Sequence, residues 1–150
     1  MKIQSERFGT FEVDDNDAIR FPEGVVGFPE EREFVLLRHR EASPIGWLQS
    51  VSNGALAFPV VSVDALALAQ PYPNTNEPAN PHAVMAVLSA AAGRPATVNL
   101  LAPIVVNVTT RIGAQVLLDD AKFSTTEPFS LRQAPRHPPA GAIAAHALNP

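Results

Sequence analysis

Short apolar runs separated by turn-forming residues constrain this chain more than any other feature. The runs are rich in Val, Ile, Phe and Leu, end at Gly, Pro, Asn or Asp, and lack the repeat of an amphipathic helix. We expect strands at 2–5, 10–13, 18–21, 34–37, 46–51, 55–63, 83–89, 97–100, 103–108 and 114–118. Strands this short and numerous predict an all-β fold: a small antiparallel barrel, closed or nearly closed, without exposed sheet edges.

Two turns fix part of the predicted strand order. Residues 52–54, Ser-Asn-Gly, separate two apolar runs, and Asn-Gly readily takes the positive φ angles of a tight hairpin, so 46–51 should pair with 55–60. A second turn at 111–113 should join the last two strands. Pro59 cannot donate a ladder hydrogen bond, which implies a bulge or a sheet edge at that position.

The length of 150 residues suits one domain and is too short for two ordinary ones. Residues 1–122 should form the barrel domain, followed by a flexible or extended Pro/Ala-rich tail at 123–150. Within that tail, 140–148 could form a short helix if something packs against it. Four prolines lie among Asn and Thr between Gln70 and His82, which predicts an exposed proline-rich loop.

Charge and cysteine content exclude several classes of protein. The net charge of −4 counts against direct nucleic-acid binding, because that binding depends on Lys and Arg neutralising phosphates. The absence of cysteine excludes disulfides, thiolate metal sites and cysteine nucleophiles. We see no signal-peptide run near the start and no apolar run of the roughly 18 residues that a membrane helix needs. We therefore expect a cytoplasmic protein without membrane contact.

No arrangement of side chains predicts catalysis or a cofactor. The four histidines lie at no metal-ligand spacing from one another or from carboxylates. Asp14, Asp15 and Asp17 resemble the start of a calcium loop but lack its glycine and closing glutamate, so a turn is the better interpretation. A Gly-x-Ser-x-Gly turn and a phosphate-binding glycine loop are both missing. We expect no enzyme activity, no metal and no cofactor.

The segment 21–29, FPEGVVGFP, has two glycines three apart between aromatic residues and prolines. In one interpretation, Gly24 and Gly27 supply positive φ in a strand-to-loop turn, while Phe21 and Phe28 anchor its ends in the core. In the other, the loop binds a partner through exposed apolar residues at its tip. Those tip residues would be Val25 and Val26, and the candidates for partner contact are Val25, Val26 and Phe28.

Four amide side chains stand inside otherwise apolar strands. They are Gln49, Asn99, Asn107 and Gln115. A buried amide should be hydrogen-bonded, so these residues either tie strands and turns together or contact a partner. The sequence leaves both roles open.

Several strings in this order resemble the FliW family of bacterial flagellar assembly factors. They are IRFPEGVVGF (19–28), FVLL (34–37), WLQSV (47–51), AFPVV (57–61), VNLLAPIVVN (98–107) and GAQVLL (113–118). The resemblance covers about residues 1–122. It implies a barrel-like fold and a regulator that binds flagellin and the RNA-binding translational repressor CsrA.

In that family, FliW freed when flagellin is exported binds CsrA and relieves its repression of flagellin translation. An acidic protein can meet a basic RNA-binding protein by charge complementarity. An apolar groove could also receive the terminal helix of flagellin. The sequence does not determine which partner is the main one, how CsrA would be antagonised, or the oligomeric state.

One segment departs from the family pattern. Family members carry a longer, helix-forming segment after the apolar strand, of which 71–72, Pro-Tyr, could remain here, but the prolines at 73 and 78 are incompatible with such a helix. The alternative function is a nucleic-acid-binding β-barrel. That would need a basic groove with stacking aromatics, and the chain has one Trp and one Tyr.

Overall fold

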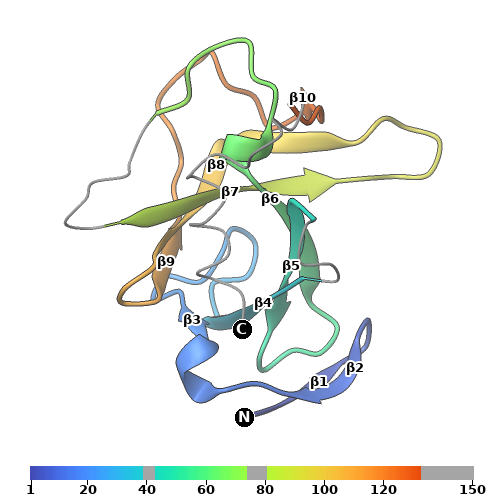
Figure 1. Ribbon diagram of the computed structural model, residues 1–150, viewed down its shortest axis with the longest axis vertical. Coiled ribbons are helices and arrows are strands. Elements are labelled where there is room, and N and C mark those ends of the chain that lie inside the picture. Colours follow the sequence, from blue (N-terminus) through green and yellow to red (C-terminus); the bar gives the residue numbers. More distant parts are fainter. Residues whose placement is uncertain (39–42, 74–80, 133–150) are drawn as a thin grey trace.

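The computed structural model describes residues 1–38, 43–73 and 81–132, and these fold into strands and two short 3-10 helices (Figure 1). The elements are β1 (Lys2–Ser5), β2 (Gly9–Glu12), η1 (Asp15–Asp17), β3 (Ile19–Arg20), β4 (Glu33–Leu37), β5 (Ile45–Ser50), β6 (Ala57–Ser62), η2 (Val63–Ala65), β7 (His82–Ser89), β8 (Thr97–Asn107), β9 (Ile112–Gln115) and β10 (Glu127–Pro128). Helix η1 is the turn predicted from the three aspartates, and no α-helix occurs in the described ranges.

Seven strands close into a barrel. They follow the order β8, β7, β6, β5, β4, β3, β9, and β9 pairs back onto β8. Neighbours run antiparallel except at the β3–β9 contact, where Arg20 lies parallel to Ile112. The hairpin β1–β2 forms a separate sheet at one end, and β10 adds to β8 outside the ring (Figure 1). The predicted all-β antiparallel barrel is confirmed.

Strand β8 replaces two of the predicted strands, 97–100 and 103–108, by one strand with a large bulge. Met85 of β7 pairs with Ile104, whereas Val87 pairs with Asn99. Between these two pairs, β8 has four residues, 100–103, where β7 has only one. The bulge in β8 therefore contains three extra residues. Because side chains alternate between the two faces of a strand, an odd number of extra residues exchanges those faces.

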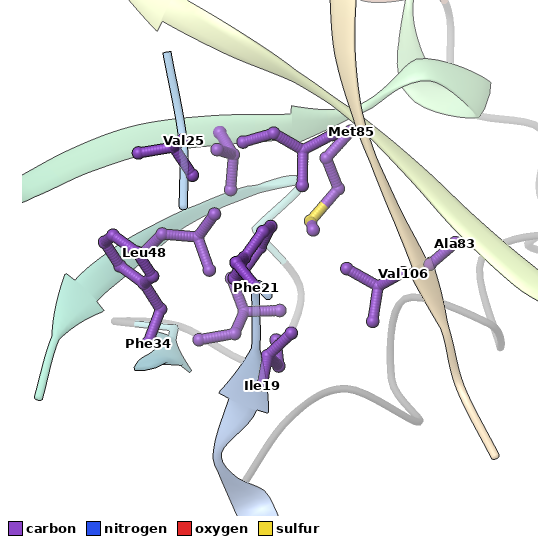
Figure 2. Packing of buried hydrophobic residues seen from close by; sticks show 11 residues of the cluster. Ile19, Phe21, Val25, Phe34, Leu48, Ala83, Met85 and Val106 are labelled. Carbon is purple, nitrogen blue, oxygen red and sulfur yellow. The ribbon is translucent and has the colours of Figure 1, made fainter. Parts of the chain in front are cut away.

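This exchange divides the apolar residues into two cores. The inner core fills the barrel (Figure 2) and contains Ile19, Phe21, Val25, Phe34, Leu36, Leu48, Val60, Ala83, Met85, Ile104 and Val106. The outer core contains Val61, Val63, Leu66, Ala86, Leu88, Val98, Leu100 and Phe123. Even-numbered residues of β8 face the outer core before the bulge and the inner core after it, so one strand serves both cores.

The folded part of the chain extends past the boundary predicted at residue 122. Phe123 is buried in the outer core, Leu131 forms a bridge with Leu66, and the Phe129 amide donates to the carbonyl of Ala96 (3.0 Å). The outer face of the sheet is apolar and needs a cover, which residues 123–132 provide. The rest of the predicted tail, including 140–148, lies outside the described residues.

The predicted proline-rich loop is described only at its two ends. Residues 70–73 contain no regular element, and 74–80 lie outside the described residues. Tyr72 fixes the first end, because its hydroxyl donates to the carbonyl of Leu100 and its ring meets Phe123 edge-on at 4.8 Å. Burial raises the pKa of the Tyr72 phenol to about 12, so this donor stays protonated at neutral pH.

The hairpin β5–β6 forms as predicted, but its connection is not a tight Asn-Gly turn. Pairing stops at Gln49 and Ala57, and Gly54 does not adopt a positive φ. Gly54 is needed for space, because a Cβ there would lie 2.2 Å from the carbonyl oxygen of Gln4 in β1. Pro59 pairs with Trp47, and the ladder to β7 begins only at the next residue, so it occupies an edge on that side.

We predict that Gly54→Ala lowers the free energy of unfolding by about 1–3 kcal/mol, because the methyl group forces β1 away from the 51–56 connection. Urea unfolding followed by tryptophan fluorescence would measure this change. The control is Ala55→Ser at the exposed neighbouring position, which should unfold like the unsubstituted chain. Equal stability of both variants would contradict the close approach of β1.

Candidate functional site

The glycine-containing loop connects β3 to β4. The amide of Phe21 donates to the carbonyl of Arg32 (2.7 Å), which closes the loop at its base. Phe21 and Val25 point into the inner core, where Phe21 meets Phe34 edge-on at 5.4 Å (Figure 2). The loop therefore packs into the barrel while its tip remains at the surface.

Both glycines have the positive φ that we predicted, +69° at Gly24 and +86° at Gly27. Gly24 has a second constraint, because a Cβ there would lie 2.6 Å from atoms of Phe28 and Pro29. Gly27 is the third residue of a turn in which the Phe28 amide donates to the carbonyl of Val25 (2.8 Å), the position where a type II turn needs positive φ. These turns place Val26 at the tip.

The structure corrects two details of the loop prediction. Val25 was expected at the exposed tip, but it is buried in the inner core with 6% of its surface accessible. Phe28 was expected to anchor the loop in the core, but it is 42% exposed. Val26 is 72% exposed, as expected. Val25 pairs with Phe28 across the turn, and this places Val26 at the turn, where its side chain is exposed.

The backbone of the β8 bulge is hydrogen-bonded at every polar group, and two of the candidate amides contribute. Asn99 Oδ1 accepts from the amides of Leu101 (3.1 Å) and Ala102 (3.0 Å). Gln115 Nε2 donates to the carbonyl of Ala102 (3.0 Å). The remaining groups pair as Leu100 N with Ser124 O, Leu100 O with the Tyr72 hydroxyl, Leu101 O with Leu118 N, and Pro103 O with Val116 N. Because a buried backbone group without a partner is costly, Asn99 and Gln115 stabilise the bulge.

Gln115 also holds the loop tip, because its Oε1 accepts from the Val26 amide (2.9 Å). Exposed apolar side chains follow directly along the chain: Val116 is 40% and Leu117 74% exposed. The two segments that Gln115 joins therefore expose four large apolar side chains. We call these side chains the apolar rim, and its members are Val26, Phe28, Val116 and Leu117.

The other two candidate amides lie in structural networks. Gln49 is completely buried: its Oε1 accepts from the Ser5 hydroxyl (2.7 Å), and its Nε2 donates to the carbonyls of Ser50 and Leu56 (3.1 Å each). It joins β1 to β5. Asn107 Oδ1 accepts from the backbone amides of Thr109 and Thr110 and so stabilises the β8–β9 turn. That turn spans 108–111, slightly before the predicted 111–113.

Charges of both signs lie close to the apolar rim in the sequence. The segments 21–31 and 112–121, which carry all four rim residues, contain five carboxylates and no Lys or Arg. The carboxylates belong to Glu23, Glu30, Glu31, Asp119 and Asp120. Arg20, Arg32, Arg111 and Lys122 stand directly outside these two segments, so the rim has no border of a single sign.

Glu31 anchors the far end of the loop. Its Oε2 accepts from the hydroxyls of Ser50 (2.8 Å), the last residue of β5, and Ser52 (2.9 Å), just beyond that strand. These hydrogen bonds, first that of Ser50 and then that of Ser52, hold the pKa of the Glu31 carboxyl below its usual value. Sequence reasoning did not single out Glu31, because neither serine is close to it in the chain.

Sequence reasoning also missed Val116 and Leu117. We placed both in a strand at 114–118, but β9 ends at Gln115, where Val116 turns toward the bulge to bond Pro103. Within the described ranges, no group of three His, Asp or Glu side chains could hold a metal ion. No helix among those residues has the length and apolar character needed to cross a membrane.

The fold and the site together define a closed antiparallel β-barrel whose candidate site is an exposed surface. The family model described as FliW protein matches residues 2–129. The chain is 40% identical over 133 residues to the flagellar assembly factor FliW of Desulfitobacterium hafniense, covering 83% of this chain and 88% of that protein. This chain therefore belongs to the FliW family.

Two further comparisons agree with this assignment. The flagellar assembly factor FliW of Heliobacterium modesticaldum is 35% identical over 139 residues, covering 83% of this chain and 88% of that protein. A crystal structure of the flagellar assembly factor FliW superposes with a TM-score of 0.73 at 30% identity and covers 89% of this chain and 100% of that chain. The similarity in structure therefore extends over most of the chain.

We predict opposite outcomes for the two valines of the loop. Val25→Asp buries a carboxylate in the inner core and should cost about 3 kcal/mol or more of unfolding free energy. Val26→Asp adds the same group at the exposed tip and should change stability by less than about 0.5 kcal/mol. Urea denaturation compares them. If Val25→Asp were as stable as Val26→Asp, the loop would not pack into the barrel as described.

We also predict that Glu31 makes stability depend on pH in the acidic range. Its folded pKa lies below the unfolded value of about 4.3, so its contribution is complete above that value and is lost as pH falls through the folded pKa. In melting curves from about pH 7 to about pH 3, Glu31→Gln should show a weaker acid-side decrease than the unsubstituted chain. The exposed neighbour provides the control: Glu30→Gln should keep the original profile. Identical profiles for all three proteins would show that Glu31 stabilises nothing.

Proposed function

We propose that this chain is a flagellar assembly factor that acts by binding flagellin and the translational repressor CsrA, without catalysis and in the cytoplasm. Membership of the FliW family carries the proposal, because a matching family model spans residues 2–129 and relatives with this description cover most of the chain. The proposed mechanism is a partner switch. Chain freed from flagellin binds CsrA and relieves its repression of flagellin translation.

The surface of the barrel is compatible with protein binding. The apolar rim exposes four large side chains on two segments that Gln115 connects. Exposed apolar residues grouped in this way mark interaction sites more often than isolated ones do. The net charge of −4 argues against nucleic acid as the direct ligand, because that binding depends on Lys and Arg neutralising phosphates.

Calorimetric titration of the purified protein with CsrA, and separately with flagellin from the same organism, tests the proposal. We expect a dissociation constant below about 1 μM for each partner, with flagellin displacing CsrA. Binding to flagellin alone would reduce the proposal to a flagellin chaperone, with the altered 70–82 segment as the first difference to examine. Binding to neither partner would refute it.

A further inference from the structure

We infer that the outer core is a strand-accepting site, and that its occupant from another molecule is the segment 123–132 of a second copy of this chain. We call this segment the strap. In the structure, the chain covers its outer core with its own strap. Swapping of straps would join two barrels, each with its own apolar rim.

The strap is held by backbone hydrogen bonds to two separate parts of the sheet. Its first half contains β10, which pairs with the start of β8. Along its second half, the Ala67 amide donates to the carbonyl of Ser130 (2.8 Å), and the Arg132 amide donates to the carbonyl of Ala65 (3.0 Å). The strap therefore occupies the position of a strand, first beside β8 and then beside 65–67.

Few side chains of the strap are buried, although its neighbours in the outer core are. Phe123 is buried and Phe129 is half-buried against the outer core, whereas 124–126 and 130–132 are exposed. Val98, which pairs with the strap, is buried. A segment with two apolar anchors, lying after the last strand of the closed ring, should open at a lower free energy than the ring itself.

An open strap leaves a site that favours capture of another strand. The Leu100 amide in the β8 bulge would lose the carbonyl of Ser124 (2.9 Å), and the Ala67 amide would lose that of Ser130. Apolar side chains of the outer core would become accessible to water at the same time. Unpaired backbone groups and exposed apolar surface are both costly, so the open site gains free energy when it is refilled.

The strap of a second copy restores all of these contacts, because it has the same phenylalanines at 123 and 129 and the same backbone pairing. Swapping an identical element is a low-cost route to dimers, since only the hinge changes its conformation. The hinge is the turn at 119–122. There Asp120 accepts from the amides of Lys122 (3.0 Å, to Oδ1) and Phe123 (3.2 Å, to the carbonyl).

Disulfide trapping tests the swap directly, because the chain has no cysteine of its own. Ala67 and Ser130 lie opposite each other beside the Leu66–Leu131 bridge, and both are exposed. A full-length chain with Ala67→Cys is mixed with a full-length chain with Ser130→Cys, incubated and then mildly oxidised. The control mixture pairs Ala67→Cys with Thr10→Cys, an exposed position in β2 that is remote from the strap in the sequence.

We expect the first mixture to give at least about tenfold more mixed disulfide dimer than the control after incubation at about 0.5 mM, a concentration at which a second copy competes with the chain's own strap. Dilution to about 5 μM before incubation should remove most of this excess, because the attached strap then wins. A chain with both Ala67→Cys and Ser130→Cys should form the disulfide within one molecule at low concentration.

Equal amounts of dimer from both mixtures would overturn the inference. Failure of the double variant to form its internal disulfide would also overturn it, because the strap would then not lie beside 65–67. If excess flagellin or CsrA abolished the excess of mixed dimer, the site would belong to that protein and the second copy would be the wrong occupant.

Hydrogen exchange of the unsubstituted chain provides a second measurement that needs no substitution. The amides of Ala67, Phe129 and Arg132 should exchange together, at least about tenfold faster than those of Leu48 and Val61 in the ring strands. Equal protection of both groups would contradict an opening strap, since the strap would then be released only when the whole barrel unfolds.

Discussion

The bulge in β8 is the feature on which the rest of the structure depends. Three extra residues between Asn99 and Ile104 exchange the faces of the strand, so that Leu100 reaches the outer core and Ile104 the inner core. A regular strand of the same sequence would direct both side chains to one side and leave one core incomplete. The exchange requires that the backbone groups of the bulge find other partners, since the ladder to β7 is interrupted there.

Those partners come from three segments that are distant in sequence. Tyr72, at the start of the proline-rich loop, and Gln115, at the end of β9, donate side-chain hydrogen bonds to the bulge. Ser124, in the C-terminal cover, accepts one with its backbone carbonyl. The same Gln115 side chain also accepts a hydrogen bond from the Val26 amide at the tip of the glycine loop. A candidate binding surface thus arises where the fold satisfies its own hydrogen bonds, and the residues that position it, Asn99 and Gln115, are distinct from the apolar side chains that it exposes.

Local patterns in the sequence were sufficient for the fold class, for most strands and for the glycine conformations at 24 and 27. They failed where a distant contact decides the outcome. Gly54 is required by the carbonyl of Gln4, Val25 is buried because the loop folds back into the barrel, and Glu31 finds its serines across a strand. The apolar rim could not be predicted either, because Leu117 looks like a strand residue until the bulge ends β9 at Gln115.

Backbone amide chemical-shift mapping of the isotope-labelled protein during titration with CsrA tests the central claim most directly. That claim is that the exposed side chains positioned by Gln115 take part in the protein binding proposed above. We expect the largest shifts at Val26, Val116 and Leu117, with little change in the β1–β2 hairpin. Shifts confined to that hairpin, with the glycine loop and the end of β9 unaffected, would contradict it.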